Sequence, residues 1–355
     1  MKNFKKLFSV FLVFVISLIA VRTMADTTQQ TGLKVHYINV GQADSELIQL
    51  DGKNILIDAG SNDNSTYNYL KQKGVTKLDY VISTHPHEDH IGGMTSVVNN
   101  FTVDKFYAPK ATATTVTFEN MIKALQSKNL KITVPTVGEN ITIGNATLTF
   151  LAPNSSVYED LNNYSIVCKL KYGDTSFLFT GDAEALSEGE ILAKQLDISA
   201  NVLKVGHHGS SSSTSQAFLD KVNPQYAVIS VGAENNYGHP NADVLNKLNS
   251  KGIRTFRSDT QGTIIATSNG QTITFNTNPV VLSNNIINNT TISNSNNSNG
   301  LNTATNNQTK TVWRANSTSK VYHLDKNCSN MKSPSSMTLI EAQNLGLNPC
   351  SKCAS

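Results

Sequence analysis

Long hydrophobic runs are nearly absent from this chain of 355 residues. The exception is an apolar run of fifteen residues at positions 7–21, which follows several lysines and ends near Thr23-Met24-Ala25, a small-residue cleavage pattern. The run is short and polar chain follows it, so it predicts a secretory signal peptide over residues 1–25. An uncleaved N-terminal anchor is the alternative. No cysteine follows the run, which argues against a lipoprotein. We expect no membrane span after signal cleavage and a secreted or cell-surface location.

A strong excess of one charge is also absent. The net charge of +3 arises from the first 25 positions, which hold four basic and no acidic residues, whereas residues 26–275 hold 19 basic and 24 acidic residues. The sequence of this body shows no basic stripe of the kind that grips nucleic acid without sequence preference. This composition weighs against general DNA binding by the body, but it does not exclude a nucleic-acid substrate.

Cysteine is scarce, with four in the chain, and Cys168 is the only one before the C-terminal region. Cys168 lies among apolar residues, so we expect a buried structural thiol. The other three cannot pair off among themselves, and together with a histidine they form His-x4-Cys and Cys-x2-Cys, a spacing typical of structural zinc. A disulfide within the Cys-x2-Cys pair is the alternative in an oxidising compartment. The predicted zinc ligands are His323, Cys328, Cys350 and Cys353.

Short apolar strands alternate with amphipathic helices between residues 33 and 275, which predicts two sheets covered by helices. Residues 276–310 are rich in Asn, Ser and Thr without a periodic apolar face, so they predict a linker. We therefore expect a main domain over residues 26–275, the linker, and a small module over residues 311–355. In that module Thr338 and Glu341 form a capping box, and Gly346 is a helix stop.

Histidine is concentrated at the end of the apolar strand predicted at residues 78–83, where three histidines and an aspartate fall within six residues. Imidazole and carboxylate are ligands for Zn²⁺, Mn²⁺ or Fe. The spacing of His85 and His87 directs both rings to one side of an extended backbone. A solvated polar loop is the alternative. The cluster predicts a metal site.

Five segments in a fixed order resemble the metallo-β-lactamase-fold hydrolases: residues 40–45, 56–60, 85–90, 179–182 and 203–210. Residues 237–240 and 258–262 match more weakly. Within this family the chain looks closest to the extracellular hydrolase domain of the competence protein ComEC and to secreted phosphorylcholine esterases. The resemblance implies an αββα sandwich of mixed α/β (α+β) class, with the active site at one edge of both sheets and two divalent ions, Zn or Mn.

The resemblance also implies a ligand set that the two ions share. His85 and His87 would bind the first ion, and Asp182, at a strand end, would bridge both. A histidine of the pair His207-His208 would complete the second site. His207 is favoured because it comes first after the strand, and His208 stays open. The whole expected set is His85, His87, Asp89, His90, Asp182, His207 and His208.

One family feature is missing, since this chain has no histidine between His90 and His207 to serve the first ion. ComEC-like members have an Asn/Ser stretch there, and residues 162–165 fit it, with Asn163 expected behind the ligands. We therefore expect the first ion to be weakly held, with water in the place of the missing ligand. Asp58 is expected to accept a hydrogen bond from a ligand and hold its loop, or else to cap a turn.

Further residues are expected to act on the substrate. Asp89 and Asp182 would be catalytic through the ions. His239 would contact phosphate or protonate the leaving oxygen, or only pack its loop. Ser210 and Ser211, before a helix predicted at residues 214–222, would receive phosphate together with the helix N-terminus. The alternative there is a flexible turn in which Thr214 is the N-cap.

The sequence thus predicts a secreted, dinuclear, metal-dependent hydrolase of phosphoesters, acting as a nuclease or phosphodiesterase. The alternatives are a phosphorylcholine esterase that acts on cell-wall polymers and a non-catalytic protein that binds DNA or wall. A β-lactamase is supported by fold alone. Residues 311–355 resemble the small zinc-binding domain of the DNA-repair protein Ada, which implies one structural zinc ion and contact with DNA or wall polymer, or only a stabilised C-terminus.

Overall fold

The computed structural model describes residues 32–282 and, further along, residues 311–315, 319–324, 326, 328, 334–338, 342 and 347–350. The chain divides into two compact units, residues 1–286 and 287–355, and each is described by itself. The predicted signal peptide, Cys353 and most of the predicted linker lie outside the described residues. Among the helices of the described part, none combines the length and the apolar character that a bilayer span requires.

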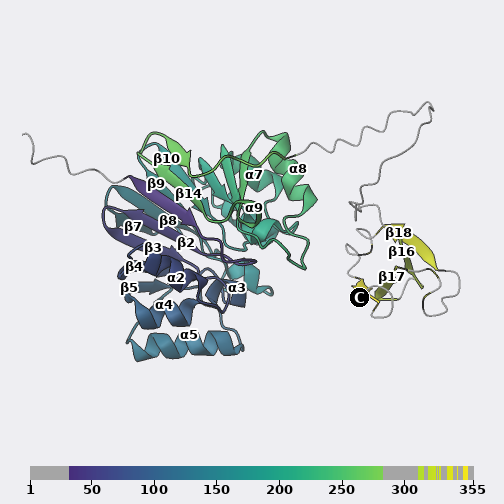
Figure 1. Cartoon of the computed structure of the whole chain (residues 1–355), viewed down its shortest axis with the longest axis horizontal. Coiled ribbons are helices and arrows are strands. Elements are labelled where there is room, and N and C mark those ends of the chain that lie inside the picture. Colours follow the sequence, from purple (N-terminus) through teal and green to yellow (C-terminus); the bar gives the residue numbers. More distant parts are fainter. Residues whose placement is uncertain are drawn as a thin grey trace, which may run out of the picture. The chain divides into compact units, whose positions relative to one another are not determined.

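Two mixed sheets form the first unit (Figure 1). Sheet A has the strand order β15-β14-β1-β2-β3-β4-β5-β6, and sheet B has the order β13-β12-β11-β10-β9-β8-β7. The strands of sheet A are β1 (Leu33–Tyr37), β2 (Glu46–Leu50), β3 (Lys53–Ile57), β4 (Lys77–Ile82), β5 (Thr102–Tyr107), β6 (Ile132–Thr133), β14 (Ile264–Ser268) and β15 (Ile273–Phe275). Those of sheet B are β7 (Asn140–Ile143), β8 (Ala146–Ala152), β9 (Val167–Tyr172), β10 (Thr175–Phe179), β11 (Val202–Lys204), β12 (Tyr226–Ile229) and β13 (Arg254–Arg257).

Central strands divide their side chains between two cores, because successive residues point to opposite faces of a sheet. In β10, Phe177 and Phe179 belong to the core between the sheets, whereas Leu178 belongs to the core on the outer side of sheet B. In β3, Ile57 faces the same central core and Leu56 faces the outer side of sheet A. Since both faces are buried, these strands need continuous apolar runs rather than an alternating pattern.

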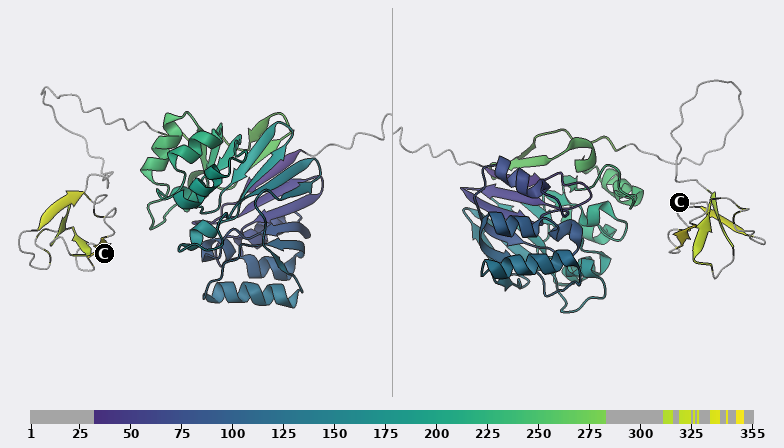
Figure 2. Two further views of the ribbon diagram at one scale, coloured as in Figure 1. Left: turned by 180° about the vertical axis from the view of Figure 1, so that it is seen from behind. Right: turned by 60° about the horizontal axis from the view of Figure 1, so that its bottom comes forward.

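Helices cover both outer faces. On sheet A lie α2 (Ser65–Gln72), α4 (Met94–Asn100) and α5 (Val116–Ser127), which cross the face of the sheet in the right-hand view of Figure 2. On sheet B lie α6 (Ala185–Ala193), α7 (Gln216–Val222) and α8 (Ala242–Ser250). The predicted αββα sandwich is therefore confirmed. The N-cap of α7 is Ser215, whose hydroxyl accepts the Phe218 N–H, so the predicted N-cap Thr214 is wrong.

The first unit continues beyond residue 275. The Val280 N–H donates to the Thr255 carbonyl over 2.8 Å, and the Gln261 side-chain amide donates to the Asn278 carbonyl. Leu282 packs against the core under α7 and α8. The predicted boundary at residue 275 is therefore too early, because backbone and side-chain hydrogen bonds and the packing of Leu282 attach the first part of the predicted linker to the first unit.

The second unit holds a four-stranded sheet with the order β18-β16-β17-β19. Its described apolar core is small, consisting of Val312, Tyr322, Ala342 and Leu347. Thr338, predicted to start a capping box, ends a strand, and most of the predicted helix lies outside the described residues. The strands are β16 (Thr311–Arg314), β17 (Val321–His323), β18 (Ser335–Thr338) and β19 (Asn348–Pro349).

Candidate metal centre

The predicted site residues come together where parallel strands of both sheets end. Asp58 directly follows β3, and the segment that carries His85 follows β4. In sheet B, Asp182 follows β10, and the turn that carries His208 follows β11. The carboxyl ends of parallel strands share one edge of a sheet, so four segments far apart in the sequence meet at one place.

Four of the predicted ligands form one compact cluster. The ligand atoms of Asp89, His90, Asp182 and His208 all lie within 4.8 Å of one another. The Asp182 Oδ2 atom is 3.3 Å from His90 Nε2 and 3.7 Å from His208 Nε2. In the described part of the chain, the buried atoms His90 Nε2 and Asp182 Oδ1 have no hydrogen-bond partner. Two carboxylates and two imidazoles with unsatisfied atoms at their centre fit a divalent ion such as Zn²⁺ or Mn²⁺.

His85 and His87 lie next to this cluster, with the His85 ring centroid 4.1 Å from that of His90. The His85 Nε2 atom is 3.0 Å from His87 Nδ1 and 4.0 Å from Asp182 Oδ2. His85 is fully buried, and its other ring nitrogen lies 3.3 Å from the Ser165 hydroxyl, which fixes the ring. Among the described carboxylates, Asp182 is the one within 4.0 Å of His85 Nε2 as well as of His90 Nε2 and His208 Nε2. This is the position that a bridging ligand requires.

The structure favours His208 over His207 as the cluster histidine, which corrects the expectation from the sequence. Both residues have left-handed backbone angles, with φ of 49° and 53°. The second imidazole is the one that joins the cluster of four, because His208 is buried and its Nε2 atom lies 3.2 Å from Asp89 Oδ2. The His207 ring stays at the rim, with Nδ1 3.2 Å from the Ser212 hydroxyl and 3.5 Å from a Glu184 carboxylate oxygen. Its Nε2 atom still lies 3.5 Å from Asp182 Oδ2.

Asp58 holds the histidine loop against sheet A. Its Oδ2 atom accepts hydrogen bonds from His90 Nδ1 over 2.7 Å and from the Thr84 hydroxyl over 2.6 Å, and its Oδ1 atom accepts the Thr84 N–H over 2.8 Å. A hydrogen bond to one ring nitrogen of a histidine leaves the other nitrogen free to bind metal. Gly181 lies close by with φ of 50°, and a Cβ atom there would be 3.0 Å from Thr84 Cβ. Glycine therefore lets the end of β10 approach the loop.

Opposite charges within the cluster shift the pKa values of its histidines and carboxylates. Burial disfavours the charged form of His90, but the carboxylates of Asp182 and Asp89 outweigh it and hold its pKa well above the usual value. Burial likewise opposes the ionised Asp182, yet His90 and His208 hold the pKa of its carboxyl well below the usual range. Burial also disfavours the charged form of His208, but the carboxylates of Asp182 and Asp44 outweigh it and raise the pKa of His208 to about 10. Because metal ligands must be deprotonated, binding of a divalent ion would release these protons.

Comparison with known proteins shows to which family this chain belongs. Residues 38–233, more than half of the chain, match the family model of the metallo-beta-lactamase superfamily. The chain belongs to this superfamily. Its relatives include a competence protein, ComA of Neisseria gonorrhoeae.

Two curated relatives and one solved structure illustrate the relationship. ComE operon protein 3 of Bacillus subtilis is 34% identical over 196 residues, which are 55% of this chain and 25% of that protein. Recombination protein 2 of Haemophilus influenzae is 32% identical over 222 residues, or 61% of this chain and 26% of that protein. The chain thus spans about a quarter of the length of these relatives. The metallo-beta-lactamase fold protein YhfI of Bacillus subtilis has a TM-score of 0.45 at 15% identity, covering 64% of this chain and 95% of that chain.

Lys204 and Asp44 form a buried ion pair next to His208. The sequence alone did not predict this pair. Lys204 Nζ donates to Asp44 Oδ2 over 2.6 Å, and both side chains are 1% exposed. Asp44 Oδ1 lies 3.3 Å from His208 Nδ1, which also lies 2.9 Å from the Ser230 carbonyl oxygen. Burial opposes the ionised Asp44, but Lys204 and His208 together lower its pKa to about 2. Asp44 and Lys204 lie in two of the segments that resemble the family, residues 40–45 and 203–210. They are 160 residues apart, so no local sequence pattern indicates that they form a pair.

We expect Lys204→Met to lower the free energy of unfolding by about 3 kcal/mol, the lower end for a broken buried pair. The carboxylate of Asp44 would stay buried without its lysine, and His208 beside it would offset part of the loss. Urea unfolding of Lys204→Met and of the double variant with Asp44→Asn measures this, and the double variant should recover part of the stability. A loss under about 1 kcal/mol in Lys204→Met would show that the pair is not needed for stability.

The cluster opens into a cavity of about 330 Å³. Predicted His239 lines it, whereas predicted Ser211 is exposed and lies outside it. The Ser210 hydroxyl is 3.0 Å from the Ser212 hydroxyl, and neither serine lines the cavity. The lining residues are Gln42, His87, Glu88, Asp89, Asn162, Asp182, His207, His208, Tyr237 and His239.

The proposed phosphate position at the start of α7 is already occupied by a side chain of the protein. The Glu188 carboxylate accepts the Thr214 N–H over 2.6 Å and the Ser215 N–H over 2.8 Å. Glu188 is 2% exposed, so burial raises the pKa of its carboxyl, and the two N–H groups oppose that shift. The expectation that this helix N-terminus receives phosphate is therefore wrong, because a buried carboxylate takes the same N–H groups.

The Asn/Ser segment contributes in two ways. Asn162 lines the cavity. Asn163 turns away from it: its side-chain oxygen accepts the Ser187 N–H over 3.2 Å, and its amide donates to Glu184 over 3.3 Å. Since Glu184 contacts His207, Asn163 acts on the rim of the site through Glu184 and not on a ligand directly.

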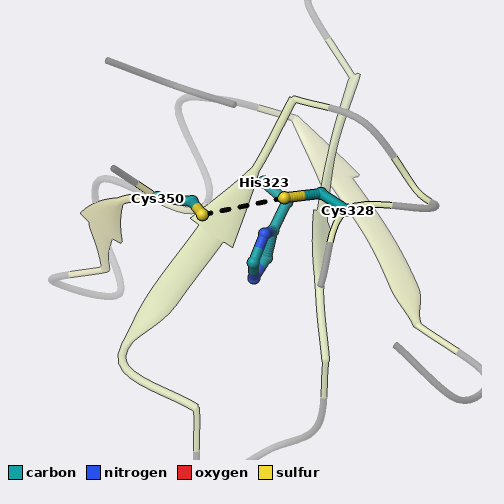
Figure 3. A group of neighbouring side chains, drawn as sticks. All are labelled: His323, Cys328 and Cys350. Atoms are coloured by element: carbon teal, nitrogen blue, oxygen red, sulfur yellow. Dashed lines mark hydrogen bonds between the residues drawn. The ribbon is translucent and has the colours of Figure 1, made fainter. Parts of the chain in front are cut away.

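The second unit carries a separate group of ligand types. His323, Cys328 and Cys350 place their ligand atoms within 4.8 Å of one another, and the two sulfur atoms are 3.8 Å apart (Figure 3). His323 and Cys350 are buried. Two sulfurs and one imidazole converging on a point fit a zinc ion. The fourth predicted ligand, Cys353, and with it the alternative disulfide, lies outside the described residues.

Proposed function

We propose that this protein is a phosphodiesterase with nucleic acid as its substrate, working outside the cell or at its surface with two divalent ions. The observation that carries the proposal is that Asp182, a member of the cluster of four, also lies 4.0 Å from His85 of the neighbouring histidine pair. Ligands arranged for two ions suit attack on a phosphorus centre, because the ions stabilise both the attacking and the leaving oxygen. The relationship to competence proteins favours nucleic acid over other phosphoesters.

Two buried carboxylates outside the cavity lining orient the histidine ligands. Divalent ions held here would supply a hydroxide nucleophile near neutral pH and polarise the phosphoryl oxygens. Asp58 and Asp44 orient His90 and His208 from behind, so that the ligand set is fixed before substrate arrives.

His239 is suited to hold a phosphoryl oxygen rather than to act as an acid. Burial and the neighbouring His207 and His208 lower the pKa of His239 to about 4, so the ring is neutral at pH 7. The Gln42 side-chain oxygen accepts the Gly232 N–H over 3.0 Å, which turns the Gln42 amide nitrogen toward His239 Nδ1 at 3.5 Å. The remaining proton of the ring then sits on Nε2, from which it can donate to a phosphoryl oxygen.

The test of this function is a panel of substrates with added Mn²⁺ or Zn²⁺. We expect hydrolysis of bis-p-nitrophenyl phosphate and of DNA, little turnover of a phosphorylcholine ester, and none of nitrocefin. Turnover of the phosphorylcholine ester alone would identify a wall esterase, and turnover of nitrocefin alone a β-lactamase. A well-folded, metal-loaded protein that turns over none of the four would be a binding protein.

We further propose that residues 311–355 bind one structural zinc ion through His323, Cys328, Cys350 and Cys353. The small described core of this unit supports the proposal, since a unit of this size needs a metal or crosslinks to be stable. A role of the unit in holding DNA or wall polymer near the active site remains part of the proposal.

Replacing Cys350 by serine in the full chain should lower the zinc content by about one ion per chain, because tetrahedral zinc needs all four ligands. Turnover of bis-p-nitrophenyl phosphate should stay unchanged, because all the proposed catalytic ligands belong to the first unit. The matched control is Cys168→Ala, which changes a buried cysteine of the first unit and should keep all the zinc. Equal zinc content in the Cys350→Ser and wild-type proteins would rule out the tail site.

A further inference from the structure

An exposed aromatic side chain stands at the mouth of the catalytic cavity. Tyr237 lines the cavity together with His239, yet it is 74% exposed. Most exposed apolar residues need no explanation, but one at the mouth of a cavity is available to a bound ligand. It follows β12 in a loop whose tip is the segment at residues 233–238.

The loop that carries Tyr237 is pinned by one asparagine. The Asn235 side-chain amide donates to the Gly232 carbonyl over 3.0 Å and to the His239 carbonyl over 2.7 Å. Its side-chain oxygen accepts the Tyr237 N–H over 3.2 Å and the His239 N–H over 3.0 Å. Four hydrogen bonds to one side chain fix both ends of the loop, so Tyr237 is held in place without being buried.

One face of the Tyr237 ring is already stacked. Its plane lies 25° from that of His239, with ring centroids 5.7 Å apart, and His239 in turn packs edge-on against His207 at 5.7 Å. The rings of His207, His239 and Tyr237 therefore follow one another from the edge of the metal cluster outward. With one face on His239 and most of its surface exposed, Tyr237 presents its other face to the solvent beside the cavity.

The charge of the cavity limits what else can hold a substrate. Its described lining holds two aspartates and a glutamate and no lysine or arginine. A long duplex is held mainly through basic contacts to many phosphates, which this lining does not offer. Single-stranded nucleic acid, in contrast, gains much of its binding energy from bases stacked on aromatic side chains.

We propose that Tyr237 is a stacking platform for the base attached to the phosphate under attack, so that the preferred substrate is an unpaired nucleotide. This inference rests on the proposed phosphodiesterase function. A base in a duplex is stacked on both sides and cannot offer a face to Tyr237 without leaving the helix. A quaternary ammonium group would need a cage of several aromatic walls, and Tyr237 is the one Phe, Tyr or Trp in the described lining.

Two small substrates with the same leaving group test the platform: the p-nitrophenyl ester of thymidine monophosphate and methyl p-nitrophenyl phosphate. We expect Tyr237→Ala to lower the ratio of their kcat/KM values roughly 5- to 100-fold, the effect of losing one stacked base. Tyr237→Phe, which keeps the ring, should stay within about twofold of the wild-type ratio. The matched control is Val116→Ala, an exposed apolar residue at the start of α5, which should leave the ratio unchanged.

The outcomes separate this inference from the function on which it rests. If the wild-type protein hydrolyses both esters and Tyr237→Ala leaves their ratio unchanged, the stacking platform is wrong and the phosphodiesterase stands. If the wild-type protein hydrolyses neither ester, the proposed function is wrong and the inference falls with it. Cleavage of duplex DNA as fast as single-stranded DNA would also overturn the preference for unpaired nucleotides.

Discussion

Replacing Asp182 by alanine should lower kcat/KM for phosphodiester hydrolysis by about a thousandfold or more, because the loss of a ligand shared by both ions removes several kcal/mol of transition-state stabilisation. Asp182 is 1% exposed, belongs to the cluster of four, and also lies 4.0 Å from His85. One of its carboxylate oxygens has no hydrogen-bond partner in the described part of the chain. Bound metal per chain should fall as well. Assay with bis-p-nitrophenyl phosphate and elemental analysis measure both effects.

The fold should survive this change, since Asp182 lies after β10 and outside the three apolar cores of the first unit. The matched control is Asp197→Ala, because the Asp197 side chain is 72% exposed and pairs with Lys169 away from the cavity. Asp197→Ala should keep full activity. Normal turnover by a well-folded Asp182→Ala protein would refute the two-ion arrangement.

Replacing His208, but not its neighbour His207, should have the second large effect on metal content and activity. His208→Ala should lose about one metal ion per chain and most of the activity, with affinity for that ion weakened by ~100-fold or more. His208 Nε2 lies 3.2 Å from Asp89 Oδ2 inside the cluster, and its other ring nitrogen is already engaged. His207→Ala should keep both ions, because His207 lies at the rim and its side chain is 23% exposed.

Elemental analysis of the two histidine variants at equal protein concentration decides between them. Each variant is the control of the other, since the residues are neighbours and the same atoms are removed. Loss of the ion in His207→Ala together with retention in His208→Ala would return the ligand role to His207. Loss in both variants would show that each histidine binds.

Much of the fold and of the site could be predicted from local patterns. Helices alternate with strands as predicted between residues 33 and 275, and the helix predicted at residues 214–222 is present as α7. The segment that carries His85, His87 and His90 could be recognised because ligand types and a strand end coincide in a short stretch.

What could not be predicted depends on backbone turns and on pairs distant in the sequence. His207 and His208 both have left-handed backbone angles, and neither is a glycine that would have indicated them. The pairing of Asp44 with Lys204, and the insertion of Glu188 into the start of α7, join segments that only the assembled sheets bring together. Val280 and Leu282 belong to a short apolar run, residues 279–282, at the start of a stretch rich in Asn, Ser and Thr, so the composition of the whole stretch assigned them to the linker.

The most direct test of the central claim is phosphodiester hydrolysis by the full chain before and after removal of metal. Chelated protein, shown by elemental analysis to be free of metal, should hydrolyse bis-p-nitrophenyl phosphate at no measurable rate, and added Mn²⁺ or Zn²⁺ should restore turnover. The Asp182→Ala protein should not respond to the added ions. Turnover by metal-free protein at the untreated rate would contradict a metal-dependent phosphodiesterase built on Asp89, His90, Asp182 and His208.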